Sequence, residues 1–142
     1  MDRGNPRSVK YNEDRLVLRP RPRGLMVDWR VLAAQRRADE SYGTKGLTLG
    51  QISMEVGVSS HYLGKLFRRE IGVTFHQYLR QVRMAMACSY LMDDVPRTIQ
   101  EVASRVGYDD TSNFVRAFRL TFGLPPSAYR AKMQTPRNPA PQ

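Results

Sequence analysis

The same helical unit is written twice in this chain of 142 residues, about fifty residues apart. The first copy contains GVSSHYLGKLFRREIG, from Gly57 to Gly72, and the second contains GYDDTSNFVRAFRLTFG, from Gly107 to Gly123. Each copy opens on glycine, an apolar residue and two small polar or acidic residues, and each closes on glycine. A chain that repeats one supersecondary unit is expected to repeat its packing, so the sequence predicts two similar subdomains.

Helix-terminal signals place the predicted helices. Three Thr-x-x-Gln or Thr-x-x-Glu segments, which begin at Thr48, Thr74 and Thr98, fit the capping box, in which the threonine hydroxyl and the Gln or Glu side chain satisfy each other's backbone amides. The glycines that bound the repeated segments occupy positions where a helix ends on a left-handed residue. Almost no strand pattern lies between the chain ends, so we expect an all-α fold.

The second helix of each copy has an apolar side and a polar, basic side. The side expected to be buried comprises Leu63, Leu66, Phe67 and Ile71 in the first copy, and Phe114, Ala117, Phe118 and Phe122 in the second. The opposite side comprises His61, Gly64, Lys65 and Arg68 in the first copy, and Thr111, Ser112, Val115, Arg116 and Arg119 in the second. A helix, a glycine turn and a helix with a polar, basic outer face are typical of a helix-turn-helix.

The charge of the chain favours a polyanionic partner. Its formal net charge is +10 and its sequence pI is about 10.4, which indicates nucleic acid first and an acidic membrane surface second. Arginine and lysine can donate to guanine edges, serine and threonine can serve either kind of base, and Val115 suits a thymine methyl. One such face is usually a solvated helix side. Two of them in one basic chain make double-stranded DNA the expected partner.

A single helix is expected to join the two copies, from Thr74 to about Met92. Its apolar residues change sides midway: Phe75, Leu79, Val82 and Met86 share one side, whereas Met84, Ala87, Cys88 and Leu91 share nearly the opposite one. A helix wedged between two small cores needs this pattern, and Cys88 is then a packing group. About nineteen residues give roughly 28 Å, slightly less than the ~34–36 Å turn of B-DNA.

The stretches LTLGQISMEVGVSSHYLGKLFRREIGVTFHQYLRQVRM and TIQEVASRVGYDDTSNFVRAFRLTFGLPPSAYR resemble the DNA-binding domain of AraC/XylS-type transcription regulators, from about Leu25 to Met133. The resemblance implies seven helices in two helix-turn-helix subdomains joined by one long helix, with a recognition helix in each. By position it implies base contacts from His61, Gly64, Lys65, Thr111, Ser112, Val115 and Arg116. Gly64 departs from the family, whose members often carry a longer polar side chain there.

The expected domain boundaries follow the same pattern. Residues 1–24 form a basic, Pro- and Arg-rich leader or interdomain linker, which is either solvated or touches phosphates; 25–73 and 94–133 form the two subdomains, 74–93 the connecting helix and 134–142 a disordered tail. A helix before position 48 is expected to carry Leu25, Trp29, Leu32 and Arg36 along one side, and a last short helix begins near Pro126. The predicted DNA-backbone contacts are Lys45, Thr48, Ser60, Arg68, Thr98, Asp110, Arg119 and Arg130.

The leading functional hypothesis is a sequence-specific regulator that reads an asymmetric DNA site, as either activator or repressor. A sequence-neutral architectural DNA-binding protein is the alternative, and RNA polymerase is a further candidate partner. Neither His61 nor His76 has partners at metal-ligand spacing, and no nucleophile is grouped with a base, so we expect no metal, no cofactor and no enzymatic activity. We also expect no membrane partner and no effector site in this chain, and a cytoplasmic, nucleoid-associated location.

Overall fold

The protein is described by a computed structural model from residue 26 to residue 134, and all of the regular structure in that range is α-helical. Seven helices follow one another in the order α1 (Trp29–Glu40), α2 (Leu49–Val56), α3 (Ser60–Ile71), α4 (Phe75–Leu91), α5 (Ile99–Arg105), α6 (Thr111–Phe122) and α7 (Pro126–Gln134). The predicted fold class is therefore confirmed. The predicted leader and almost all of the predicted tail lie outside the described residues.

The predicted helix ends are formed by the expected side chains. Thr48, Thr74 and Thr98 are the N-caps of α2, α4 and α5, and each makes both hydrogen bonds of the capping box. The Thr98 hydroxyl, for example, accepts from the Glu101 amide at 3.0 Å, and the Glu101 carboxylate accepts from the Thr98 amide at 2.8 Å. The four glycines that bound the repeated segments all have positive φ, between 82° and 97°. These local signals are sufficient to place the helices.

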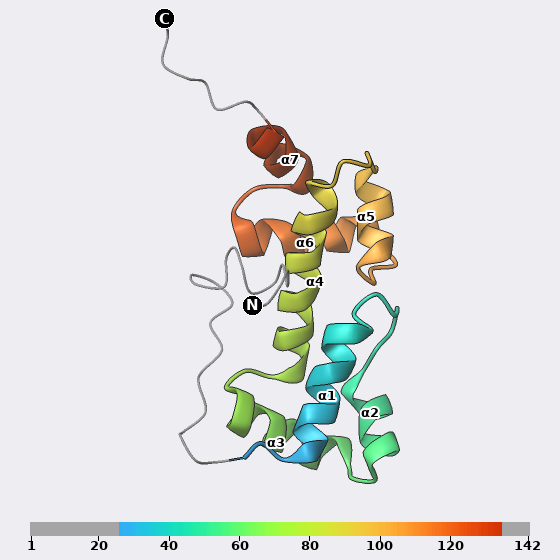
Figure 1. Ribbon diagram of the computed structural model, residues 1–142, viewed down its shortest axis with the longest axis vertical. Helices are drawn as coiled ribbons and strands as arrows, with labels where there is room; N and C mark the ends of the chain where they lie inside the picture. Colours follow the sequence, from blue (N-terminus) through green and yellow to red (C-terminus); the bar gives the residue numbers. More distant parts are fainter. Residues whose placement is uncertain (1–25, 135–142) are drawn as a thin grey trace, which may run out of the picture.

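Two separate hydrophobic cores lie along α4, which runs through the length of the molecule (Figure 1). Helices α1, α2 and α3 pack around its first half, and α5, α6 and α7 gather around its second half. The first core is centred on Leu63 and Phe67 of α3, and the second on Phe114 and Phe118 of α6. Both α3 and α6 lie across α4 in Figure 1, so each unit presents one helix crosswise to the common axis.

The change of apolar side along α4 is confirmed. Its first half gives Phe75, Leu79 and Val82 to the first core, whereas Met84 and Leu91 of its second half belong to the second core. Ala87 and Cys88 also lie in the second core, as packing residues. Met86 packs against both cores. The helix has 17 residues, which corresponds to about 26 Å at ~1.5 Å per residue.

The side of the first helix that carries Trp29, Leu32 and Arg36 faces away from the core. Trp29 and Leu32 are 62% and 43% exposed, and Arg36 is exposed as well. The buried side of α1 is made of Val31, Ala34 and Ala38, each fully buried. Alanines let the α1 backbone approach α4 and α3 closely, so shape outweighs the greater hydrophobic area of the larger side chains. Leu25, the fourth residue of the expected side, lies outside the described residues.

The last helix closes the second core through its aromatic residue. Helix α7 begins at Pro126, as predicted, and the proline itself is buried. The ring of Tyr129 lies edge-on to Phe118, with centroids 5.4 Å apart, and 5.7 Å from Phe122. Burial raises the pKa of Tyr129, and a hydrogen bond to Cys88 acts in the same direction. Helix α7 therefore holds one end of α6 in place against α4.

Candidate nucleic-acid interface

The outer side of α3 is fixed by its buried side and by its two ends. Ser59 is the N-cap, and its hydroxyl accepts from the Tyr62 amide at 3.0 Å. Gly72 closes the helix with a φ of 97°. The four residues expected to be buried, Leu63, Leu66, Phe67 and Ile71, are all buried, at 6% exposure or less. The side chains on the opposite side of α3 must therefore face away from the core.

A groove on this side collects the residues expected from the first copy. Its lining residues are Leu49, Ser60, His61, Gly64, Lys65, Arg68, Thr74, Phe75 and His76. His61, Lys65, Arg68 and His76 are exposed, so the groove offers two imidazoles and two cations to a ligand. His76, in the first turn of α4, was missed by the sequence reasoning. The Thr74 capping box places His76 two residues into α4, and the α3–α4 turn carries it back beside α3.

Gly64 is not required by packing. A Cβ built on it would lie 3.5 Å from Leu49 Cδ2, which is an ordinary van der Waals contact. Glycine inside a helix costs up to about 1 kcal/mol relative to alanine, and nothing in the core around Gly64 offsets that cost. The effect of glycine is instead to remove a side chain from the middle of the groove, between His61 and Lys65. The backbone of α3 is more accessible there than a larger residue would leave it.

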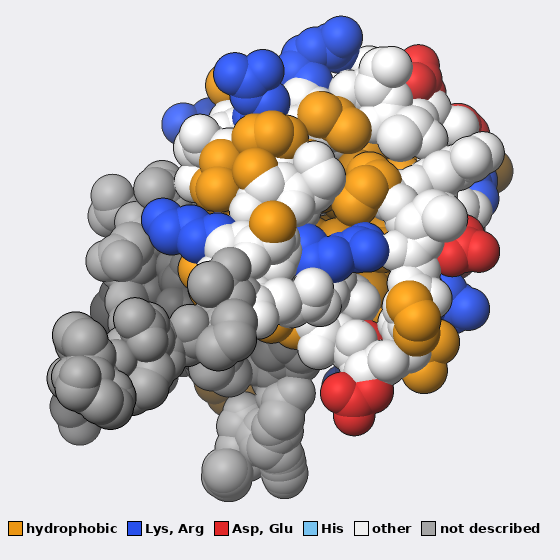
Figure 2. Space-filling view, turned by 90° about the horizontal axis from the view of Figure 1, so that it is seen from above, with side chains coloured by type: hydrophobic (Ala, Val, Ile, Leu, Met, Phe, Trp, Pro, Cys, Tyr) orange, Lys and Arg blue, Asp and Glu red, His pale blue; other side chains and the backbone are white. Residues whose placement is uncertain are grey.

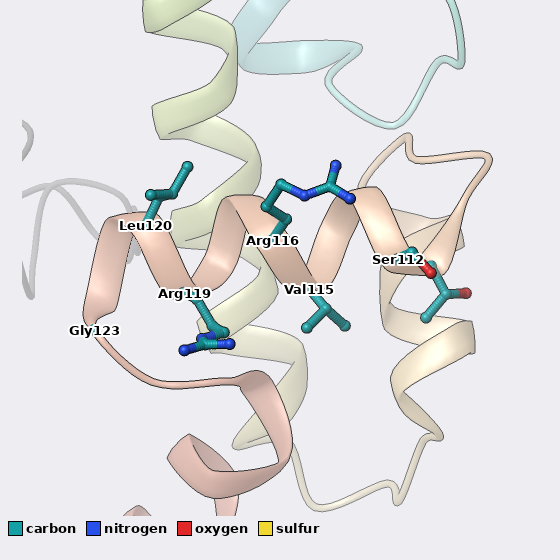
Figure 3. A pocket seen from close by; sticks show the side chains of 7 residues that line it. Ser112, Val115, Arg116, Arg119, Leu120 and Gly123 are labelled. Atoms are coloured by element: carbon teal, nitrogen blue, oxygen red, sulfur yellow. The ribbon is translucent and has the colours of Figure 1, made fainter.

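A second groove collects the residues expected from the second copy. It is lined by Thr111, Ser112, Val115, Arg116, Arg119, Leu120 and Gly123, all on α6 or at its end. In Figure 3, Val115 and Arg119 leave the helix on one side, and Arg116 and Leu120 leave it on another. Leu120 is 81% exposed and was not expected in the site. It follows Arg116 by one helical turn, so the 3.6-residue period could have indicated it.

The side chain of Arg116 is held in place by its own helix. Its Nη1 donates to Asn113 Oδ1 at 2.8 Å, one turn earlier on α6. This contact leaves the other guanidinium N–H groups free to donate outward, because Arg carries five donors in a planar fork. The arginine is exposed, so it can meet a ligand without moving a core residue. A pre-oriented guanidinium loses less side-chain entropy when it binds.

The residues expected at the DNA backbone fall into two groups. Arg68 and Arg119 are exposed and line the two grooves beside the other expected residues. Thr48 and Thr98 lie at exposed helix starts, but outside both grooves. Helix α3 begins at Ser60, and its neighbour Ser59 supplies the capping hydroxyl. Ser60 itself lines the first groove as the first helical residue.

Three further expected backbone residues also make hydrogen bonds within the protein. The Asp110 carboxylate accepts from the Ser112 amide at 2.8 Å, so it already occupies the end of α6 with a negative charge. Lys45 Nζ donates to Ser104 Oγ at 2.9 Å, outside both grooves. Arg130 Nη2 donates to the Arg97 carbonyl oxygen at 2.7 Å, and its Nε is buried. For Arg130 in particular, the contacts in the structure are internal ones.

Charge is unevenly distributed on the face seen from the end that carries α7. There, basic side chains are spread over the surface, whereas acidic side chains lie along the right-hand and lower margins of the view (Figure 2). Within residues 26–134, no group of three His, Cys, Asp or Glu side chains is placed to hold a metal ion. None of the seven helices is both long enough and apolar enough to cross a membrane.

Comparison with known proteins yields one family and several close folds. The model of a helix-turn-helix domain family matches residues 52–132. The Msm operon regulatory protein of Streptococcus mutans is 33% identical over 93 residues, which cover 66% of this chain and 33% of that protein. The C-terminal domain of AraT, a response regulator from Geobacillus stearothermophilus, superposes with a TM-score of 0.72 and 28% identity, covering 83% of this chain and 98% of that one.

The fold has also been solved with DNA in another protein. The DNA-binding domain of AdpA, a global transcriptional factor crystallised with a target DNA, shares the fold with a TM-score of 0.66 and 23% identity, over 76% of this chain and 97% of that one. This chain spans only part of the curated relatives that it matches, for example 33%, 11% and 30% of their lengths. The similarity therefore concerns one domain of those longer proteins.

Proposed function

The chain belongs to the AraC/XylS family of helix-turn-helix transcription regulators, and from that premise we propose that it binds double-stranded DNA with α3 and α6 in neighbouring major grooves. The observation that carries this proposal is the pair of grooves: each repeated unit turns one exposed, basic helix side outward, and both helices lie across the same α4. A rod of about 26 Å is slightly shorter than the ~34–36 Å turn of B-DNA. Straight DNA therefore fits imperfectly, so that either the DNA bends or one unit docks weakly.

We assign the base contacts to residues that line the two grooves. In the first groove these are His61 and Lys65, with Gly64 giving the DNA access to the helix backbone. In the second they are Thr111, Ser112, Val115 and Arg116. Arginine donates two hydrogen bonds to guanine, and Val115 suits a thymine methyl. The two sets differ in every position, so the preferred site is asymmetric.

The phosphate contacts come from the edges of the two grooves and from helix starts outside them. Arg68 and Arg119 are exposed beside the base-reading residues. Thr48 and Thr98 cap α2 and α5 at the surface, and since their own amides donate to Gln51 and Glu101, the contacts there come from the first-turn amides that the capping boxes leave free. Ser60 and the start of α6 at Asp110 complete the set on the two crosswise helices. Lys45 and Arg130 keep their internal contacts and add long-range positive potential. Such contacts position the protein without reading sequence.

The cellular role follows from the family. We propose that the chain regulates transcription from the cytoplasm while bound to the nucleoid, and that RNA polymerase is a second partner. The Msm operon regulatory protein is a regulator by name, and AdpA is a transcriptional factor. This account assigns no catalytic residue and no cofactor to the chain. A sequence-neutral architectural role has no support among the relatives.

Selection from random DNA duplexes tests the proposed function. We expect enrichment of one asymmetric site of roughly 15–20 bp, because two recognition helices one turn apart span that length. Replacing Arg116 with alanine should relax the preference at one or two base pairs and cost about tenfold to a hundredfold in affinity for the selected site. The measurement is a binding titration on every single-base variant of that site.

The matched control is Arg36→Ala, which removes an exposed arginine of α1 that lines neither groove. It should weaken binding to all sequences equally and only slightly. If no sequence is enriched over competitor DNA, the regulator proposal fails and the architectural alternative is favoured. If Arg116→Ala lowers affinity for every duplex to the same extent, Arg116 contacts phosphate and its assignment to a base is wrong.

A further inference from the structure

The two helix-turn-helix units touch each other directly, in addition to sharing α4. The loop between α1 and α2 lies against the turn that ends α5 (Figure 1). A Cβ built on Gly43 would lie 2.7 Å from the Arg105 carbonyl oxygen, and one on Gly107 would lie 2.6 Å from the Tyr42 carbonyl oxygen. Both distances are too short for a real side chain. The two backbones therefore meet at two glycines, one from each unit.

Arg83 of α4 bridges this meeting point. Its Nε donates to the Tyr42 carbonyl oxygen and its Nη2 to the Thr44 carbonyl oxygen, both at 2.8 Å, so it holds the first unit's loop by two hydrogen bonds. The same guanidinium lies over the ring of Tyr108, 5.6 Å from its centroid, in the second unit. A Cβ on Gly107 would also collide with Arg83, at 2.7 Å from Nη2. The Arg83 side chain thus contacts both helix-turn-helix units at once.

Two further hydrogen bonds join the first unit's loop to α4 and to α5. The hydroxyls of Tyr42 and Tyr90 are 3.2 Å apart, and Lys45 Nζ donates to Ser104 Oγ at 2.9 Å. Tyr42 packs against both hydrophobic cores. Burial lowers the pKa of Arg83 from its usual value, but an arginine remains protonated in a protein, so its donors are kept. The Tyr42 carbonyl oxygen is partly buried, so the loss of its charged donor costs more than the loss at the exposed Thr44 carbonyl oxygen.

We propose that Arg83 is a positioning residue that fixes the distance and angle between the two reading helices, and so restricts the protein to DNA sites with one spacing between the two contacted segments. The inference rests on the proposed function for its DNA readout. If α4 were the only connection, the two units could move relative to each other as α4 bends or twists. The junction at Arg83 is a second connection beside the axis of α4, and two connections prevent a rotation of the units that one connection permits.

Spacing is the property that such a junction controls. Adding one base pair moves one contacted segment by ~3.4 Å and turns it by about 35° around the DNA axis. A rigid pair of units then loses the base contacts of one recognition helix, and each good bidentate contact contributes about tenfold to a hundredfold. If the two units can move relative to each other, the second unit follows the displaced DNA segment and keeps its base contacts. The spacing preference therefore measures how rigidly the two units are held, whereas the overall affinity does not.

The first test uses the free protein without DNA. Residual dipolar couplings of α1–α3 and of α5–α7 should fit one alignment tensor in the wild-type protein and two different tensors in Arg83→Met. Arg83→Lys keeps the charge but lacks the planar fork that reaches two carbonyl oxygens. The difference between its two tensors should therefore be smaller than in Arg83→Met, and it replaces Arg83→Met in this test if that variant does not fold. The control Arg80→Met removes an exposed arginine one turn away on α4 and should keep one tensor.

The second test measures binding of the same variants to duplexes in which the spacing of a selected site is changed by one base pair in each direction. The wild-type protein and Arg80→Met should lose about a hundredfold on either change, and Arg83→Met about tenfold or less. A single tensor for Arg83→Met and Arg83→Lys overturns the proposal, whatever the DNA results. An unchanged spacing penalty with lower affinity at every spacing also overturns it, since that is the effect of mere destabilisation. If the wild-type protein selects no site, the proposed function fails and the dipolar couplings alone decide for or against a rigid junction.

Discussion

Replacing Phe118 with alanine is expected to lower the free energy of unfolding by about 3–5 kcal/mol. Phe118 is fully buried, and its ring contacts three other aromatic rings, those of Phe114, Phe122 and Tyr129, at centroid distances of 5.9, 4.5 and 5.4 Å. The change removes a large buried side chain and leaves a cavity among aromatic rings that are held by α4 and α7. Such aromatic pairs contribute about 0.5–1.5 kcal/mol each beyond the area they bury.

The loss should fall mainly on the second unit, because the second core is separate from the first along α4. Small domains are stable by only about 5–15 kcal/mol, so the second unit would lose much of its order. Urea denaturation followed by circular dichroism gives the change in free energy, and amide spectra show which helices lose protection. The matched control is Leu120→Ala, two residues further on the same helix and 81% exposed, which should change stability by less than about 0.5 kcal/mol. A loss below about 1 kcal/mol for Phe118→Ala would contradict the packing described for α6.

Raising the salt concentration is expected to weaken DNA binding by about a thousandfold between ~50 mM and ~200 mM. If two grooves with exposed Arg68 and Arg119 and the surrounding helix ends neutralise about six phosphates, the slope of log K against log salt is near −5. The measurement is a fluorescence anisotropy titration of one selected duplex at four or five salt concentrations. Each lost phosphate contact should make the slope less steep by about one.

Two variants separate the phosphate contacts from the base contacts in that titration. Arg68→Ala should reduce the slope by about one and weaken binding to all duplexes, because Arg68 is assigned to the backbone. Val115→Ala should leave the slope unchanged while lowering the preference for one base pair, because a thymine methyl contact releases no ion. A slope near zero for the wild-type protein would show that phosphates are not the main source of affinity, and would favour a protein partner instead.

Much of the fold could be predicted because its signals are local. The capping boxes at Thr48, Thr74 and Thr98 and the glycines after the helices depend on residues within one turn of each other, so the sequence contains them completely. The change of side along α4 was also readable, since it follows from the 3.6-residue period alone. The outer sides of α3 and α6 follow from the same period.

Which side of a helix is buried could not be predicted where side chains of different size compete. On α1 the row that contains Trp29 and Leu32 was expected along one side, and the buried side is the one with Ala34 and Ala38, because small residues allow close helix packing. The hydrophobic pattern of one helix does not predict the shape of the surface against which that helix packs. The exposed Leu120 was placed on neither side of α6 by the sequence reasoning, although it follows Arg116 by one helical turn.

Contacts between residues far apart in the sequence could not be predicted from the repeat. His76 reaches the first groove only because the turn after α3 folds back, and Arg83 meets Tyr42 and Thr44 across 41 and 39 positions of sequence. Gly43 and Gly107 carry no sign in the sequence that each faces the other unit's backbone. These features depend on the path of the chain in three dimensions. The base and phosphate assignments stay predictions for the same reason, because they depend on where DNA lies.

The central claim is that one molecule holds two reading helices in successive grooves on one side of the duplex. Hydroxyl-radical footprinting of a selected duplex, at a protein concentration where sedimentation shows one protein per duplex, tests it most directly. The account predicts two protected segments of unequal strength, separated by about ten base pairs and displaced to the same side of the helix. A single protected segment, or a two-fold symmetric pattern that requires two proteins per duplex, would contradict it.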